Sequence, residues 1–107
     1  MDGVDIACCQ FYQENGQWKW QIEAAQTVPY SEQWRVRIAY LYQQNAEIFH
    51  KTNVFYGHYL GQLVKDFIAE HRLVVDFVAS HGHTLFHRPE LGYTAQIGDG
   101  AALSAIS

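Results

Sequence analysis

The chain has 107 residues, enough for one small domain with a modest core. Its formal net charge is −4 and its lysines and arginines form no cluster, which argues against binding to nucleic acid or to an anionic membrane. No apolar run approaches the length of a membrane span, and the polar residues 1–5 do not resemble a signal peptide, so we expect a cytoplasmic protein.

Residues 4–12 are apolar and lack proline, which predicts a strand buried on both faces. Within this strand, the neighbouring Cys8 and Cys9 cannot form an unstrained disulfide with each other and lack zinc-motif spacing. We expect them to be small buried side chains of a protein in a reducing compartment. Asn15-Gly16 then predicts a hairpin turn.

Residues 18–24 alternate between apolar and polar side chains, which predicts an antiparallel strand with one packed face. The apolar positions are Trp18, Trp20, Ile22 and Ala24.

Two helices are predicted next. Ser31 is a suitable N-cap for a helix that runs to about residue 43, and Asn45 for a second, longer helix. The second helix carries an aromatic and aliphatic stripe at helical spacing, which we interpret as core. Gly57 and Gly61 lie four residues apart within it and predict close packing against a neighbouring element. The histidines of this helix are expected at the surface or boundary: His50, His58 and His71.

The last third begins with residues 73–79, a continuous apolar run after a helix, which predicts a buried parallel strand. A polar turn follows over residues 80–84. Residues 84–87 and 93–97 predict a second hairpin, and residues 101–106 the start of a helix. Both ends of the chain are abrupt, so we expect a single incomplete lobe cut from a larger domain.

Three polar groups are candidates for chemistry. Asp2-Gly3-Val4-Asp5 suits a tight loop that brings backbone amides and carboxylates near a magnesium nucleotide, although acidic turn residues are usually only solvated. Gln96-Ile97-Gly98-Asp99-Gly100 precedes a helix, and there Asp99 either accepts hydrogen bonds from sugar hydroxyls or only caps the helix.

The third group contains histidines. His81 and His83 lie two apart in an extended segment, with His87 and Asp99 further along, a spacing that suits a transition metal and a hydrolase. Glycine-flanked histidines at a strand end equally suit hydrogen bonding to a hydroxylated ligand. Ligands bind past the carboxyl ends of strands in open α/β sheets, so this region is a candidate site on either interpretation.

Three segments together resemble one family: DGVDIA at the start, VDFVASHGHTLFHRP in the middle and YTAQIGDGA near the end. In this order and spacing, the chain resembles the first part of an anhydro-N-acetylmuramic acid kinase. The resemblance implies an α/β fold, a partial ribonuclease-H-like lobe of the actin-like sugar-kinase class, with a mixed sheet and helices. It also implies ATP and Mg²⁺ as cofactors.

The implied reaction opens the 1,6-anhydro ring of anhydro-N-acetylmuramic acid with water and phosphorylates its 6-oxygen, within bacterial cell-wall recycling. Carried onto this sequence, the resemblance implies a nucleotide site at Asp2, Gly3, Val4 and Asp5. It implies sugar-binding residues in the other two motifs: His81, Gly82, His83, Thr84, Gln96, Gly98 and Asp99.

The chain also departs from the family pattern. The Gly-Thr-Ser half of the nucleotide loop is missing, together with the first strand of the lobe, which should lie between residues 4–12 and 73–79. The resemblance implies that the family's catalytic aspartate and second lobe lie beyond Ser107. We therefore expect these 107 residues to be inactive alone, and a homodimer is implied only for the full-length enzyme.

Two other functions stay open on the sequence. One is a metal-dependent hydrolase that uses His81, His83 and His87. The other is a non-catalytic domain that binds a partner protein through exposed Trp18 and Trp20 or through an unfilled sheet edge.

Overall fold

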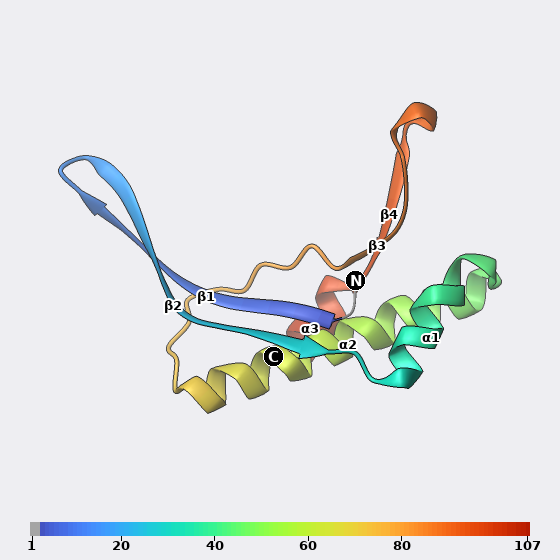
Figure 1. The fold of residues 1–107 in the computed structure, drawn as a ribbon, viewed down its shortest axis with the longest axis horizontal. Coiled ribbons are helices and arrows are strands. Elements are labelled where there is room, and N and C mark those ends of the chain that lie inside the picture. The colour runs from blue at the N-terminus through green and yellow to red at the C-terminus, as the bar shows by residue number, and fades with distance from the viewer. Residues whose placement is uncertain (1–2) are drawn as a thin grey trace.

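A long β-hairpin opens the chain. The computed structural model describes residues 3–107, and β1 (Gly3–Glu14) pairs antiparallel with β2 (Gln17–Pro29). Asn15 and Gly16 form the turn with φ of 54° and 77°, the two left-handed positions that a tight hairpin turn needs. Figure 1 shows the far half of this hairpin as an arm that extends away from the helices. Both strands and the turn confirm the sequence prediction.

The predicted burial of this hairpin is wrong. No residue of β1 is buried, and the alternating face of β2 is open, with Trp18 69% and Trp20 65% exposed. The physical reason is that each strand has only the other as a partner, and no described element covers the arm. Cys8 is half-buried and Cys9 exposed, both as free thiols, so the prediction of buried cysteines is wrong for Cys9.

The two predicted helices are present. Helix α1 (Glu32–Tyr40) begins after Ser31, whose Oγ accepts a hydrogen bond from the Trp34 N–H at 3.3 Å, and it continues into a 3₁₀ turn, η1 (Leu41–Gln43). Helix α2 (Ala46–His71) begins after Asn45, whose Oδ1 accepts from the Ile48 N–H at 2.9 Å. Capping side chains at these positions satisfy amides that have no partner within the helix.

The two glycines of α2 lie against the last helix, α3 (Gly100–Ile106). A Cβ on Gly57 would lie 2.5 Å from the Asp99 carbonyl oxygen, and one on Gly61 would lie 2.6 Å from the Leu103 carbonyl oxygen. The prediction of close packing is confirmed. The three other predictions for α2 also hold, since His50 and His71 are exposed and His58 is at the boundary.

The predicted buried strand at residues 73–79 is wrong. This segment contains no strand, and Val74 is 96% and Phe77 77% exposed. Among residues 3–107, the backbone of residues 74–81 makes no hydrogen bond to another backbone group. A buried strand requires a neighbour that pairs with its backbone, and no described strand lies close enough to do so.

The second hairpin consists of β3 (His83–Arg88), a 3₁₀ turn η2 (Pro89–Leu91) and β4 (Tyr93–Ile97). It confirms the prediction, and it projects from the body in another direction than the first hairpin (Figure 1). Within residues 3–107 the fold is thus α/β with two separate two-stranded antiparallel sheets and three α-helices. The predicted mixed sheet is absent from this range.

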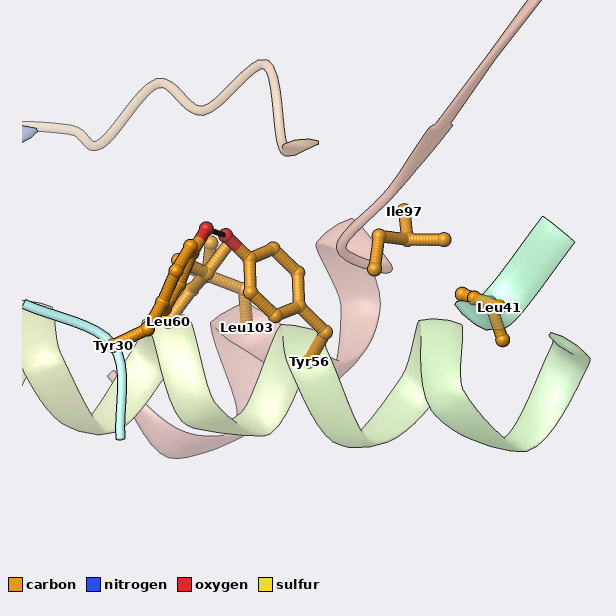
Figure 2. Packing of buried hydrophobic residues seen from close by; sticks show 6 residues of the cluster. All are labelled: Tyr30, Leu41, Tyr56, Leu60, Ile97 and Leu103. Carbon is orange, nitrogen blue, oxygen red and sulfur yellow. Dashed lines mark hydrogen bonds between the residues drawn. The ribbon is translucent and has the colours of Figure 1, made fainter. Parts of the chain in front are cut away.

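The core lies where α2 meets the ends of both hairpins. Figure 2 shows its buried members, with the hydroxyl groups of Tyr30 and Tyr56 pointing toward each other above α2. These buried residues are Tyr30, Leu41, Tyr56, Leu60, Ile97 and Leu103. No helix within residues 3–107 combines the length and the apolar character that crossing a membrane requires.

Candidate functional site

The first predicted motif lies at the start of β1. Asp2 falls outside the described residues. Gly3 lies close to β2, because a Cβ there would overlap the Val28 carbonyl oxygen, and Val4 packs against the core. Asp5 is exposed, and its Oδ1 accepts a hydrogen bond from the Thr27 Oγ1 at 2.6 Å, across the strand pair. Its second oxygen, Oδ2, has no hydrogen-bond partner among residues 3–107 and is available to a ligand.

His81 and Gly82, the first two of the predicted sugar-binding residues, lie across a slot from β1. The slot is bordered by the outer edge of β1 on one side and by the extended segment before β3 on the other, with α2 below. His81 and Gly82 line it together with Gly3, Val4 and Asp5. The structure therefore brings the predicted nucleotide motif and the start of the predicted sugar motif to one hollow.

His83 has a different environment. It is 8% exposed, and its Nδ1 lies 3.3 Å from the Tyr30 hydroxyl, which in turn lies 2.5 Å from the Tyr56 hydroxyl. Burial lowers the pKa of His83, so the imidazole is neutral at pH 7. Burial also raises the pKa of both tyrosines, which keeps the two hydroxyl protons in place.

The metal constellation does not form. Among residues 3–107, no three histidine, cysteine, aspartate or glutamate side chains lie close enough to hold a metal ion. His81 lines the slot, His83 is turned into the core, and His87 is exposed further along β3. The irregularity in the β3–β4 register between Thr84 and Phe86 lies between His83 and His87, and it breaks the alternation that would place these two side chains on one face of β3. The hydrolase hypothesis therefore has no support in this geometry.

Thr84 and Gln96 share the exposed face of the second hairpin. They are directly paired across the strands, and Gln96 Nε2 donates to Thr84 Oγ1 at 3.4 Å and to Thr94 Oγ1 at 3.0 Å. Thr84 also borders a second hollow, between α1 and β3, which we call the His83 hollow. It is lined by Tyr30, Arg35, Ile38, Ala39, Tyr42, His83, Thr84 and Leu85.

Gly98 and Asp99 are held at the start of α3. Gly98 has φ of 116°, and its N–H donates to Asn53 Oδ1 at 2.8 Å. Asp99 Oδ2 accepts from the Ala102 N–H at 2.8 Å, so the capping role predicted for Asp99 is present. Neither residue lines the slot or the His83 hollow.

Three residues that organise the site were not predicted from the sequence: Tyr30, Asn53 and Tyr56. Tyr30 follows Pro29, the last residue of β2, and carried no motif. Tyr56 belongs to the stripe that was interpreted as core, which is correct for its ring but says nothing of its hydroxyl. Asn53 lies three positions before Tyr56, among the apolar residues of α2. A polar side chain in such a stretch could have indicated a hydrogen-bonding role, since a half-buried amide needs partners.

Comparison with known proteins gives one consistent result. A family model described as anhydro-N-acetylmuramic acid kinase matches residues 1–107. The proteins of that name from Acaryochloris marina and Paramagnetospirillum magneticum are both 31% identical, over 97% and 98% of this chain and 29% of their own length. That from Methylorubrum populi is 47% identical over 47% of this chain and 14% of its own length. The chain thus spans under a third of the length of these relatives.

Proposed function

Since the chain belongs to the anhydro-N-acetylmuramic acid kinase family, we propose that it is part of an ATP-dependent kinase that acts on 1,6-anhydro-N-acetylmuramic acid. The supporting observation is the family match over residues 1–107, which include all three motifs. In the proposed reaction, the oxygen of water bonds to C1 as the bond from C1 to the 6-oxygen breaks. The 6-oxygen then takes a phosphoryl group from ATP, and the product is N-acetylmuramic acid 6-phosphate.

The residues at the start of β1 fit a magnesium nucleotide. Asp5 offers a carboxylate oxygen, which is the ligand type that Mg²⁺ prefers. When bound, ATP with Mg²⁺ supplies the phosphoryl group. Phosphoryl transfer depends on positioning and on charge stabilisation from several sides. We therefore propose that residues 1–107 alone are inactive.

We propose that the sugar meets the hydroxyl, amide and imidazole groups at the end of the slot and on the second hairpin. His81, Gly82, His83 and Thr84 come from the middle motif, and Gln96, Gly98 and Asp99 from the last. Asp99 keeps Oδ1 available while Oδ2 caps α3. A cytoplasmic location and a homodimer of the full-length enzyme complete the proposal.

The activity is testable with the completed chain, extended at both ends from its gene. It would be incubated with Mg·ATP and the anhydro sugar in oxygen-18 water, and the product weighed by mass spectrometry. We expect a sugar phosphate with one heavy oxygen, and strong loss of product for Asp5→Asn but not for Asp66→Asn, an exposed carboxylate on α2. A folded protein that forms no sugar phosphate would contradict the proposal.

We further propose that the lobe is ribonuclease-H-like and that one more strand fills the slot. The support is that the outer edge of β1 and the backbone of residues 74–81 both lack partners within residues 3–107, and both border the same slot. A strand between them would satisfy both sets of amides and carbonyls and cover Val64 and Phe67. Its addition from the gene should protect amides on β1 and in residues 74–81 from hydrogen exchange. Protection on neither would contradict this fold.

A further inference from the structure

A buried chain of hydrogen bonds joins three elements of the fold. The Tyr56 hydroxyl on α2 lies 2.5 Å from the Tyr30 hydroxyl at the end of β2, and Tyr30 lies 3.3 Å from Nδ1 of His83 at the start of β3. The three side chains are 2%, 8% and 8% exposed, respectively. Figure 2 shows the two hydroxyl groups meeting above α2.

The direction of these two hydrogen bonds follows from where the hydroxyl and imidazole protons can be accepted. If Tyr56 donates to Tyr30 and Tyr30 donates to His83 Nδ1, each hydroxyl proton has an acceptor. If Nδ1 carried the proton instead, it would donate to Tyr30, Tyr30 would donate to Tyr56, and the Tyr56 proton would have no acceptor among residues 3–107. In the first arrangement the proton without a protein acceptor is on Nε2, whose ring borders the His83 hollow between α1 and β3, where water or a ligand can accept it. In the second it is on the Tyr56 hydroxyl, whose side chain is only 2% exposed. A buried donor without an acceptor is costly, so the first arrangement is favoured.

The tautomer of His83 follows from this direction. A neutral imidazole whose Nδ1 accepts a hydrogen bond carries its proton on Nε2. Nε2 has no hydrogen-bond partner among residues 3–107, and the ring borders the His83 hollow beside Thr84. Burial, which lowers the pKa of His83, supports the neutral form.

We propose that Tyr30 and Tyr56 are positioning residues that hold His83 as the Nε2–H tautomer, so that His83 donates a hydrogen bond to an oxygen of the bound ligand. A neutral donor of this kind suits an uncharged ligand with hydroxyl or carbonyl oxygens. That this ligand is the sugar rests on the function proposed above, whereas the tautomer does not.

The tautomer can be measured without any ligand. In the 107-residue chain labelled with ¹⁵N-histidine, long-range ¹H–¹⁵N spectra at pH 7.5 distinguish a protonated from an unprotonated ring nitrogen, and His83→Gln assigns the His83 signals. We expect an unprotonated Nδ1 and a protonated Nε2. A proton on Nδ1, or on both nitrogens, in the wild-type chain would overturn the proposal.

Variants then test the role of the tyrosines. Tyr30→Phe should shift His83 toward a mixture of tautomers, and Tyr56→Phe should shift it less, because Tyr30 can still donate. Tyr59→Phe is the matched control, since its ring packs in the same aromatic cluster but its hydroxyl has no hydrogen bond within residues 3–107. Near-ultraviolet circular dichroism checks that each variant is folded. A folded Tyr30→Phe with an unchanged His83 pattern would overturn the proposal.

The link to the sugar is tested separately in the completed enzyme. Tyr30→Phe should raise the KM for the anhydro sugar several-fold with a smaller effect on kcat, while the KM for ATP stays the same. Equal effects on both KM values would contradict a role in sugar recognition. A completed enzyme without kinase activity would contradict the proposed function but would leave the measured tautomer standing.

Discussion

The contact between Gly57 and the start of α3 sets two physical effects against each other. Replacing a glycine with alanine at an exposed position in a helix interior stabilises the helix by about 1 kcal/mol, because glycine has more backbone freedom to lose. Here, however, the new Cβ would lie 2.5 Å from the Asp99 carbonyl oxygen and 3.0 Å from both the Asp99 nitrogen and the Ala102 Cβ. Two of these three atoms belong to the backbone and cannot rotate away.

The size of the net effect follows from these contacts. Overpacking costs about 1–3 kcal/mol, and we take the upper part, about 2–3 kcal/mol, because the obstacle is backbone. After subtracting the propensity gain of about 1 kcal/mol, Gly57→Ala should lower the free energy of unfolding by about 1–2 kcal/mol.

Urea unfolding followed by far-ultraviolet circular dichroism measures this change. The midpoint should fall while the slope m is unchanged. Ala69→Gly, at an exposed position of the same helix, is the control that measures propensity alone and should destabilise by up to about 1 kcal/mol. If Gly57→Ala proved as stable as the wild type or more stable, the close approach of α2 and α3 would be wrong.

Two further predictions concern the site residues. Asp99→Ala removes the acceptor for the Ala102 N–H and should lower the free energy of unfolding in urea by about 1 kcal/mol. Asp99→Asn keeps a capping oxygen and should lower it less. Equal losses for the two variants would argue against capping. Burial lowers the pKa of His83 in the folded protein, so the folded chain resists protonation there. As the pH falls through about 6.5, the ordinary pKa of histidine, the unfolded chain binds a proton that the folded chain does not. The free energy of unfolding should therefore fall below that pH. His83→Gln should flatten this dependence in thermal melts between pH 8 and 5, and a slope as steep as that of the wild type would show that another group is responsible.

Local signals in the sequence predicted local structure well. Ser31, Asn45 and Asp99 cap the three helices, and Asn15-Gly16 turns the first hairpin, because each acts through atoms a few residues away. The spacing of Gly57 and Gly61 also predicted a packed face, although it did not identify α3 as the neighbour.

Burial could not be predicted in the same way. Residues 4–12 and 73–79 have the composition of buried strands. Composition shows only that a segment is compatible with burial, because burial itself depends on which elements pack beside it. For the candidate site, some residues of two motifs line one slot, but the motifs gave no sign that His83 turns toward Tyr30 while His81 faces the slot. That difference arises from the tertiary hydrogen bond between His83 and Tyr30, which are 53 residues apart in sequence.

The distribution of the three tryptophans has a spectroscopic consequence. Trp18 and Trp20 lie on the open arm of the first hairpin, whereas Trp34 stacks on Tyr59 with ring centroids 5.1 Å apart, next to the core. Emission from the two arm indoles therefore resembles that of tryptophan in water before and after unfolding, and acrylamide should quench it readily. The change in fluorescence on unfolding comes mainly from Trp34, so intrinsic fluorescence reports on the junction of α1 and α2 rather than on the chain as a whole.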